Sequence, residues 1–254
     1  MKIKILGSGT STGVPVIGCD CEVCKSNNPK DNRLRSSLLI ESEGKNIIID
    51  TGPDFRLQML RENIKNIDAV LLTHGHYDHI GGFDDLRPLC FFNAKQIPVY
   101  TNNDTTNKLK TNYPYIFGDL IQEGGGVANV KVIEISNQLF SVFGIDVKPI
   151  PIKHGILDIF GFRIGNFAYI TDASEIPNDS YKLLNNLDIL ILNALRPKIH
   201  PTHFNFEQAI EEAQKIGAKK TYFIHLSHNM LHSEIEKKLP KNIYVTYDGL
   251  SIDT

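Results

Sequence analysis

The segment Thr73-His74-Gly75-His76-Tyr77-Asp78-His79 follows a hydrophobic strand predicted over Ala69-Val70-Leu71-Leu72-Thr73. Three imidazoles and one carboxylate therefore stand within six residues at a strand end, where the backbone can turn their side chains toward one point. Zinc, manganese and iron all accept this mixture of ligands in proteins. A solvated polar loop is the alternative, but the spacing, with Gly75 inside the segment, favours a metal site.

Four further residues with ligand chemistry end later or neighbouring strands of the predicted sheets. They are Asp50 in Asp50-Thr51-Gly52, His154 in Lys153-His154-Gly155, Asp172 in Thr171-Asp172, and His225 in Ile224-His225-Leu226. Each has an ordinary explanation when taken alone, because a single histidine is usually a surface or core residue and Asp172 could cap a helix. Their joint occurrence at strand ends favours one shared site.

With these residues in this order, the chain resembles the metallo-β-lactamase superfamily over nearly its whole length. The resemblance implies one metal held by His74, His76 and His154, a second held by Asp78, His79 and His225, and Asp172 as the bridge between them. Asp50 would lie behind the metal ligands and orient one of them without binding a metal itself. A pair of cations about 3.5–4 Å apart generates a hydroxide at neutral pH and neutralises an oxyanion. The metals implied are two zinc, manganese or iron ions.

Three of the four cysteines crowd into Cys19-x-Cys21-x-x-Cys24, whereas Cys90 lies in an apolar context typical of a small core residue. The three are too close together for relaxed disulfides, so the cluster favours a metal over free surface thiols. A tetrahedral zinc would need one more ligand, and His228 is the candidate. This pairing, after the loop Gly7-Ser8-Gly9-Thr10-Ser11-Thr12-Gly13, resembles the phosphoribosyl cyclic phosphodiesterase branch, which implies a separate structural zinc.

Two pairs of residues are candidates for substrate contacts. His200 and His203 precede a predicted helix, and in the phosphodiesterase branch a histidine at this place contacts phosphate and protonates the leaving oxygen; His203 is the closer match. The alternative is that both merely shape a turn. Arg33 and Arg35 precede the first predicted hairpin, where bidentate capture of phosphate and an ordinary solvated pair are both compatible with the sequence.

The strand and helix pattern predicts a single α+β domain over residues 1–254, a four-layer αβ/βα sandwich of two mixed sheets with helices outside. Helices are predicted over 55–63, with Asp54 as the cap, and over 206–216, with Asn205 as the cap and Gly217 as the stop. Strands are predicted over residues 2–6, 37–41, 46–50, 69–73, 130–135, 143–150, 161–164, 166–171, 189–193 and 221–226.

Composition limits the partners. The net charge is −2, with basic residues scattered along the chain, so the sequence shows no footprint for a large nucleic-acid surface, although a small anionic substrate is compatible. No apolar run reaches the roughly 18 residues of a membrane span and no signal peptide is evident, which predicts a cytoplasmic protein. The resembling branch also makes a homodimer an option.

The predicted activity is that of a phosphoric diester hydrolase acting on a small or cyclic diester. A hydroxide shared by the two metals would attack phosphorus, Asp78 and Asp172 would tune it, and His203 would protonate the departing alkoxide. One alternative is an RNA 3′-processing endonuclease of the tRNase Z type, but Tyr100–Val127 is short and weakly basic for its RNA-gripping arm. The other is a metal-dependent binding protein without turnover, which the complete set of seven ligands disfavours.

Overall fold

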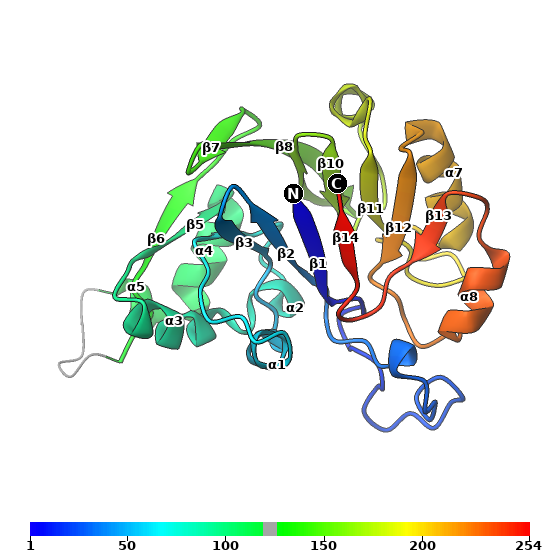
Figure 1. The fold of residues 1–254 in the computed structure, drawn as a ribbon, viewed down its shortest axis with the longest axis horizontal. Coiled ribbons are helices and arrows are strands. Elements are labelled where there is room, and N and C mark those ends of the chain that lie inside the picture. Colours follow the sequence, from blue (N-terminus) through cyan, green and yellow to red (C-terminus); the bar gives the residue numbers. More distant parts are fainter. Residues whose placement is uncertain (119–125) are drawn as a thin grey trace.

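Two seven-stranded β-sheets pack face to face in the computed structural model, which describes residues 1–118 and 126–254 (Figure 1). The first sheet has the order β14-β1-β2-β3-β4-β5-β6 and the second β13-β12-β11-β10-β9-β8-β7. The strands of the first are β14 (Ser251–Asp253), β1 (Lys2–Gly7), β2 (Ser37–Ser42), β3 (Lys45–Ile49), β4 (Ala69–Leu71), β5 (Ile97–Thr101) and β6 (Val130–Glu134). Those of the second are β13 (Ile243–Val245), β12 (Lys220–Ile224), β11 (Ile189–Asn193), β10 (Phe167–Ile170), β9 (Leu157–Ile164), β8 (Ile145–His154) and β7 (Phe140–Val142).

Helices cover the outer face of each sheet. Beside the first sheet lie α1 (Phe55–Arg61), α2 (Tyr77–Ile80), α3 (Leu86–Phe92), α4 (Asn103–Asn112) and α5 (Pro114–Phe117), and beside the second lie α6 (Asn178–Tyr181), α7 (Phe206–Ile216) and α8 (His232–Lys238). Short 3₁₀ turns occur at Pro29–Asp31, Phe83–Asp85 and Lys182–Leu184. The predicted four-layer α+β sandwich is confirmed. No helix among the described residues is long and apolar enough to cross a membrane.

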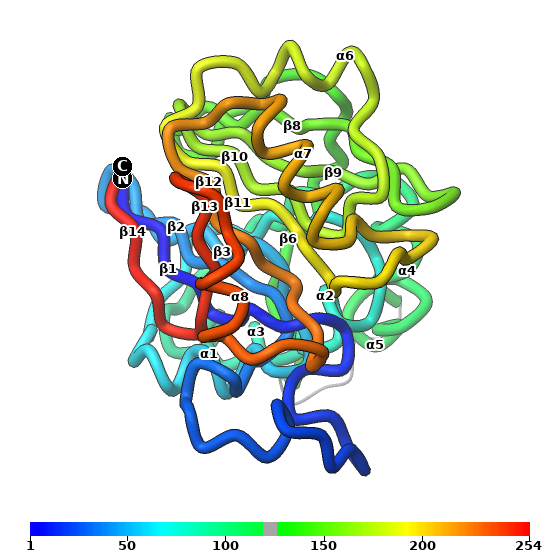
Figure 2. The backbone as a smooth tube through the Cα atoms, turned by 90° about the vertical axis from the view of Figure 1, so that its right-hand side faces the viewer, coloured from blue at the N-terminus to red at the C-terminus, as the bar shows by residue number. Residues whose placement is uncertain are grey.

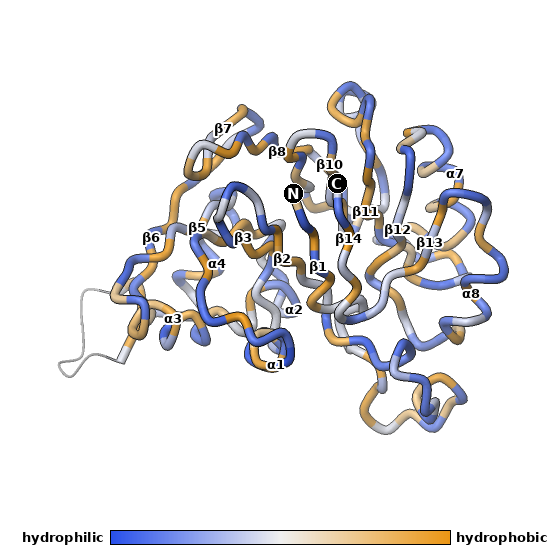
Figure 3. The backbone as a smooth tube through the Cα atoms, viewed as in Figure 1, coloured by the Kyte–Doolittle hydropathy of each residue, from blue (hydrophilic) through white to orange (hydrophobic). Residues whose placement is uncertain are grey.

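The alternation of side chains along the strands divides the apolar residues into layers. Ile47 and Ile49 of β3 point into the core between the two sheets, whereas Ile48 packs on the helices outside. The second sheet does the same, because Ile191 faces the central core and Leu190 faces the α7 side. Strands β8 to β11 accordingly carry hydrophobic stretches, whereas α8 is largely hydrophilic (Figure 3).

Both sheets contain a parallel part that brings the carboxyl ends of strands to one edge. β3, β4, β5 and β6 are parallel neighbours in the first sheet, and β10, β11, β12 and β13 are parallel neighbours in the second. The residues that directly follow such strands therefore lie near one another. The chain ends meet at the opposite end of the sandwich, where β14 pairs with β1 (Figures 1 and 2).

The local signals of the two predicted helices had different outcomes. Asn205 caps α7 in a reciprocal capping box with Gln208, and Gly217 ends this helix in the left-handed conformation at φ 69°, both as predicted. Asp54 occupies the predicted N-cap position of α1, but its side chain makes no cap hydrogen bond to the helix. Its carboxylate instead accepts hydrogen bonds from the backbone N–H and the guanidinium of Arg35 at 2.8–3.1 Å. The charged guanidinium of Arg35 is a stronger donor to this carboxylate than the neutral backbone N–H groups at the start of the helix.

Strand β8 is longer than the sequence suggested. The prediction ended this strand at Ile150, but the structure continues it through Pro151 to His154. The prolines do not interrupt it, because Pro149 and Pro151 keep their register opposite β9 while Ile152 packs into the core. His154 is therefore the last residue of a strand, which agrees with its expected place at a strand end. Strands β5, β7, β13 and β14 and helices α2 to α6 and α8 were not predicted.

Candidate metal centre

The residues of the predicted metal site gather at the edge where the parallel strands of both sheets end. His74 and His76 follow β4, Asp78 and His79 lie in α2, and His154, Asp172 and His225 stand at or just after β8, β10 and β12. Asp50, Asp172 and His225 adopt left-handed backbone conformations, with φ of 65°, 57° and 61°. Such conformations are costly for residues with a side chain, and they persist where packing on all sides enforces them, often at functional sites.

The side chains form two compact groups joined by a third. His74, His76 and His154 make up the first group, and Asp78, His79, Asp172 and His225 the second; within each, the ligand atoms all lie within 4.8 Å of one another. His154 and Asp172 also belong to a third group with His203, under the same limit. Asp172 therefore lies between the two principal groups, as expected for a bridging carboxylate.

Distances in the second group match those around one cation. His79 Nε2 lies 3.2 Å from Asp78 Oδ2 and 3.2 Å from Asp172 Oδ2, and His225 Nε2 lies 3.3 Å from Asp172 Oδ1. Two ligand atoms bound tetrahedrally to one zinc ion at about 2.0–2.1 Å are roughly 3.3 Å apart. His79 Nε2 is also buried without a hydrogen-bond partner. These residues therefore fit a divalent cation.

The first group presents free nitrogen atoms in the same way. The Nδ1 atoms of His74 and His154 are occupied, at 3.0 Å from Thr73 Oγ1 and 2.7 Å from the Thr202 carbonyl oxygen. These contacts turn each Nε2 toward the centre. His74 Nε2 is buried and has no hydrogen-bond partner, which is unusual for a buried polar atom and is explained by a metal ligand.

Electrostatics favour a cation at this place. Burial lowers the pKa of His74 well below its ordinary value and lowers that of His225 to about 4, so both rings are neutral and keep a lone pair at pH 7. Burial opposes a charge on His79, but the surrounding carboxylates, first Asp78 and Asp172, raise its pKa well above the ordinary value. A positive charge between these carboxylates is therefore stabilised.

Asp50 supports the centre from behind. Its carboxylate accepts a hydrogen bond from His79 Nδ1 at 2.8 Å and from the backbone N–H of Thr73 at 2.8 Å. It thereby links the end of β3 to the ligand segment after β4 and fixes the orientation of the His79 ring. The carboxylate–imidazole pair is a common support for a metal-binding histidine.

Two glycines allow α2 to approach the end of β3. A Cβ atom added at Gly52 would lie 2.1 Å from the Asp78 carbonyl oxygen, and one at Gly82 would lie 2.2 Å from the Gly52 carbonyl oxygen. No side chain fits at either position without moving the backbone. Larger residues there would therefore displace Asp78 and His79.

The two histidines predicted for substrate contact have different positions. His203 Nε2 lies 3.0 Å from Asp172 Oδ1, so this ring reaches the centre. His200 lies behind it, with its Nδ1 atom 3.1 Å from His203 Nδ1 and 3.2 Å from Thr202 Oγ1. The two residues therefore differ in position: His203 faces the candidate metal ligands, and His200 contacts the His203 ring from behind.

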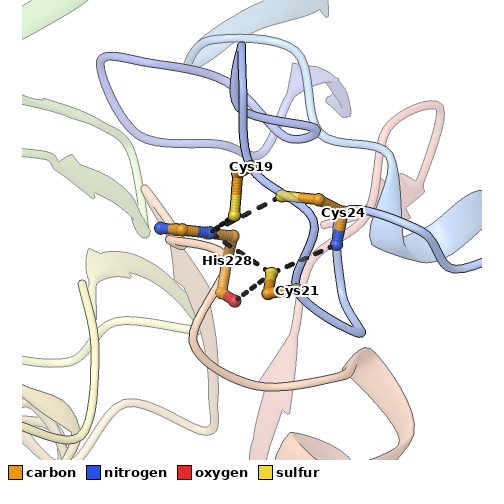
Figure 4. Close-up of side chains that lie close together, drawn as sticks. All are labelled: Cys19, Cys21, Cys24 and His228. Carbon is orange, nitrogen blue, oxygen red and sulfur yellow. Dashed lines mark hydrogen bonds between the residues drawn. The ribbon is translucent and has the colours of Figure 1, made fainter.

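The cysteine cluster forms a separate site on a loop outside the sandwich. Figure 4 shows Cys19, Cys21 and Cys24 around the ring of His228, whose Nδ1 lies 3.3, 3.4 and 3.5 Å from their sulfur atoms. All four ligand atoms lie within 4.8 Å of one another. A tetrahedral zinc with three sulfur ligands and one nitrogen ligand places these atoms roughly 3.6 Å apart, so the residues fit zinc. The backbone N–H of Cys24 lowers the pKa of the Cys21 thiol to about 6, which favours its thiolate.

The arginines do not occupy the expected positions. Arg33 is 1% exposed, and its guanidinium donates to the Ser227 and Met230 carbonyl oxygens and pairs with Asp31 at 3.3 Å. The expectation that Arg33 binds substrate is therefore wrong, because a fully buried side chain with these partners cannot reach a ligand. It ties the cysteine loop to the segment that carries His228. The Arg35 guanidinium is paired with Asp54 and the Ser11 carbonyl oxygen.

Several supporting residues were not predicted. Thr10 Oγ1 and Ser36 Oγ contact the two ring nitrogens of His225 at 3.0 and 3.2 Å, and Thr202 holds His154. Thr10 lies in the glycine-rich loop and Thr202 lies between His200 and His203, but neither was assigned a role. All three residues are distant in sequence from the ligands that they contact, and hydroxyl residues are too common in loops to mark a site.

Fold and site together define a class, the metal-dependent hydrolases with two facing sheets and a histidine–carboxylate centre at their edge. The chain belongs to the β-lactamase superfamily: the family described as "Beta-lactamase superfamily domain" matches residues 45–226. A solved structure, described as a new diphosphatase from the PhnP family, is 45% identical with a TM-score of 0.93 and covers 100% of this chain and 97% of that one. The predicted superfamily is confirmed, and the PhnP-family structure matches the predicted branch.

Two other similar proteins share less with this chain. An octanoyltransferase from Porphyromonas gingivalis is 42% identical over 254 residues, which cover 98% of this chain but 51% of that protein. The chain thus spans about half the length of this curated relative. The short form of human tRNase Z has a TM-score of 0.71 and covers 100% of this chain and 99% of its own, but at 18% identity it is evidence of the fold alone.

Proposed function

We propose that this chain hydrolyses a small or cyclic phosphodiester, in which a P–O–C bond breaks, or a small diphosphate diester, in which the P–O–P bond breaks. The observation that carries the proposal is the position of His203, whose Nε2 lies 3.0 Å from Asp172 at the junction of the two ligand groups. A proton donor at the edge of a dinuclear centre suits the departure of an oxygen from phosphorus. The similarity to a PhnP-family diphosphatase supports the same class.

The residues proposed to hold two divalent cations are those of the two ligand groups, His74, His76 and His154 for one and Asp78, His79, Asp172 and His225 for the other. Zinc, manganese and iron are all compatible with nitrogen and carboxylate ligands, whereas the three thiols and His228 are proposed to hold a structural zinc. Cations bound at the first two positions would polarise the phosphoryl oxygens and lower the pKa of a water molecule.

The side chains have separate tasks in this proposal. His203 donates a proton to the leaving oxygen, which would lie beside Asp172, and its ring is fixed by Thr202 Oγ1 at 2.9 Å and by His200. Asp50 orients His79, and Thr202 and Thr73 orient His154 and His74. Arg35 does not contact a phosphate while its guanidinium is paired with the Asp54 carboxylate.

The alternative of an RNA 3′-processing enzyme finds little support in the region of its expected arm. Residues 97–117 form β5, α4 and α5, which belong to the sandwich, and residues 119–125 of the predicted segment lie outside the described part of the chain. The net charge of −2 gives no broad basic surface. Octanoyl transfer is not proposed, because half of the relative with that name has no counterpart in this chain.

The test combines metal analysis with two substrates. The purified protein is analysed for bound metals and then assayed on bis(4-nitrophenyl) phosphate and on a precursor tRNA with a 3′ trailer, before and after a chelator. We expect two cations at the histidine–carboxylate centre, one zinc at the cysteines, and turnover of the small diester that is lost with chelator and restored by metal. Metal-loaded protein that hydrolyses no diester would overturn the proposal, and efficient cleavage of the precursor tRNA alone would favour the alternative.

A further inference from the structure

A groove next to the metal centre has no role in the function proposed above. It has a volume of about 210 Å³ and lies between α4 and the start of β9. Its lining includes His74, Gly75, Thr105, Lys108, Leu157 and Asp158. Since His74 is a proposed metal ligand, a substrate bound at the centre has this groove beside it.

Lys108 extends over Gly75, between two of the proposed ligands. A Cβ atom added at Gly75 would lie 2.6 Å from Lys108 Cδ and 3.2 Å from Lys108 Cβ, so the lysine stem rests where another residue would have a side chain. Lys108 also lines the groove together with His74. Gly75 is therefore the residue that lets the side chain of Lys108 lie close to the centre.

Lys108 is exposed to solvent and forms no ion pair with the described residues around it. Among the described residues, no carboxylate comes within the 4.0 Å of an ion pair with Lys108. Asp158, which lines the same groove, is already paired with Lys153 at 2.7 Å. Asp104, one helical turn before Lys108, also lines the groove without forming this pair.

An ammonium group beside a centre for two divalent cations is unfavourable unless an anion lies between them. A simple phosphodiester brings one negative charge, which the cations at the centre already neutralise. A diphosphate diester brings a second phosphate, adjacent to the one under attack. That group has to lie outside the centre but close to it, where it would profit from a compensating cation.

We propose that Lys108 binds the second phosphate of a diphosphate diester and selects this substrate class over simple phosphodiesters. The inference rests on the proposed hydrolase function and adds a specificity-determining residue to it. In the reaction, the oxygen of water bonds to one phosphorus, the bridging P–O bond breaks, and the other phosphate departs with the electron pair. The products are two phosphate monoesters, and the protons of water go to the products and the solvent. Lys108 stabilises the charge that grows on the departing phosphate.

Two variants separate the effect of the side-chain charge at position 108 from the effect of side-chain length. Lys108→Gln removes the charge and keeps most of the stem, whereas Lys108→Arg keeps the charge. Lys110→Gln, an equivalent change at an exposed position of the same helix, is the matched control. The substrates are diadenosine diphosphate and bis(4-nitrophenyl) phosphate, with metal content measured for every variant.

We expect Lys108→Gln to lower kcat/KM for diadenosine diphosphate about 10- to 100-fold, the value typical of a lost charge-assisted contact, and to leave bis(4-nitrophenyl) phosphate within about 3-fold. Lys108→Arg restores most of the loss, and Lys110→Gln has no effect. An equal decrease on both substrates, or no decrease on the diphosphate, would overturn the inference.

A binding measurement separates this inference from the proposed function. Calorimetry compares adenosine 5′-(α,β-methylene)diphosphate with adenosine monophosphate, and Lys108→Gln should weaken only the former, again by about 10-fold. Turnover of neither substrate by the wild type would contradict the proposed function, and the calorimetric result would still decide the role of Lys108. Turnover of the simple diester alone, with equal binding by wild type and variant, would contradict the role of Lys108 and leave the hydrolase function standing.

Discussion

The histidine–carboxylate centre and the cysteine cluster both bring metal-ligating side chains together, but they are built in opposite ways. The ligands of the centre come from strand ends of both sheets, and all except His76 are buried. Those of the cluster come from one loop and from His228, and all are partly exposed. The cluster loop extends away from the sandwich in Figure 1, and Val23 is its only buried hydrophobic residue between Val16 and Cys24.

This difference indicates what each metal would do. The two sheets fix the positions of the centre's ligands, and they keep Asp172 and His225 in left-handed conformations. The cysteine loop has too small an apolar core to order itself, and a metal would have to supply the stability. Removing the metals of the centre should therefore abolish catalysis and preserve the fold. Removing the zinc of the cysteine cluster should lower the stability of the fold and leave catalysis by the folded protein unchanged.

The largest effect on turnover is expected for Asp172→Asn. Asparagine tolerates the left-handed conformation of this position, so the backbone is kept while the charge between the two ligand groups is lost. The loss of several kcal/mol of electrostatic stabilisation corresponds to a decrease in kcat of about 10³-fold or more. Mass spectrometry should find less metal at the centre and an unchanged zinc content at the cysteines. Full activity with the normal metal content would exclude Asp172 as the shared ligand.

A smaller and substrate-dependent effect is expected for His203→Ala. A general acid matters most when the leaving oxygen is strongly basic, so hydrolysis of a 2′,3′-cyclic nucleotide should decrease about 10²- to 10³-fold. Bis(4-nitrophenyl) phosphate, which has a good leaving group, should be affected much less. His200→Ala is the comparison variant and should lose about 10-fold or less, because His200 contacts His203 and Thr202 and none of the candidate metal ligands. Equal losses on both substrates would indicate a role in binding rather than in proton transfer.

Cys21→Ser tests the other region. Serine keeps the size of the side chain but is a poor zinc ligand, so zinc should be lost and the protein destabilised by roughly 3 kcal/mol, which lowers Tm by about 6–12 °C. The kcat on bis(4-nitrophenyl) phosphate, measured well below the new Tm, should stay within about 3-fold. Cys90→Ser, outside the cluster, is the control for zinc content. An unchanged zinc content in Cys21→Ser would contradict the structural site.

The smallest effect is expected for Arg33→Lys, which tests whether Arg33 stabilises the cysteine loop or belongs to the substrate site. Lysine keeps the charge next to Asp31 but cannot reproduce the hydrogen bonds to both Ser227 and Met230. The protein should lose about 1–2 kcal/mol of stability, a decrease in Tm of a few degrees, whereas KM should not change. A large increase in KM at an unchanged Tm would return Arg33 to the substrate site.

Residues that interact within a short stretch of chain could be read from the sequence. The six-residue motif from His74 to His79, the cysteine triplet, and the cap and stop of α7 all carry their meaning in local spacing. The four-layer sandwich also follows from the sequence, because the alternation of apolar residues and the resemblance agree. Proline-containing β8 shows the limit of such rules, since tertiary packing overrides a local signal when both faces of a strand are covered.

Only the folded chain decided which distant side chains meet. The sequence could not separate His203 from His200, pair Arg35 with Asp54, or bury Arg33 beside Asp31. Nor did it point to Lys108, whose significance depends on the missing side chain of Gly75 and on a helix that was not predicted. The physical reason is the same in each case. The ability to bind a metal is a property of a residue type and can be recognised in the sequence. Burial and the balance of charge depend on neighbouring residues, which only the packing of the two sheets brings together.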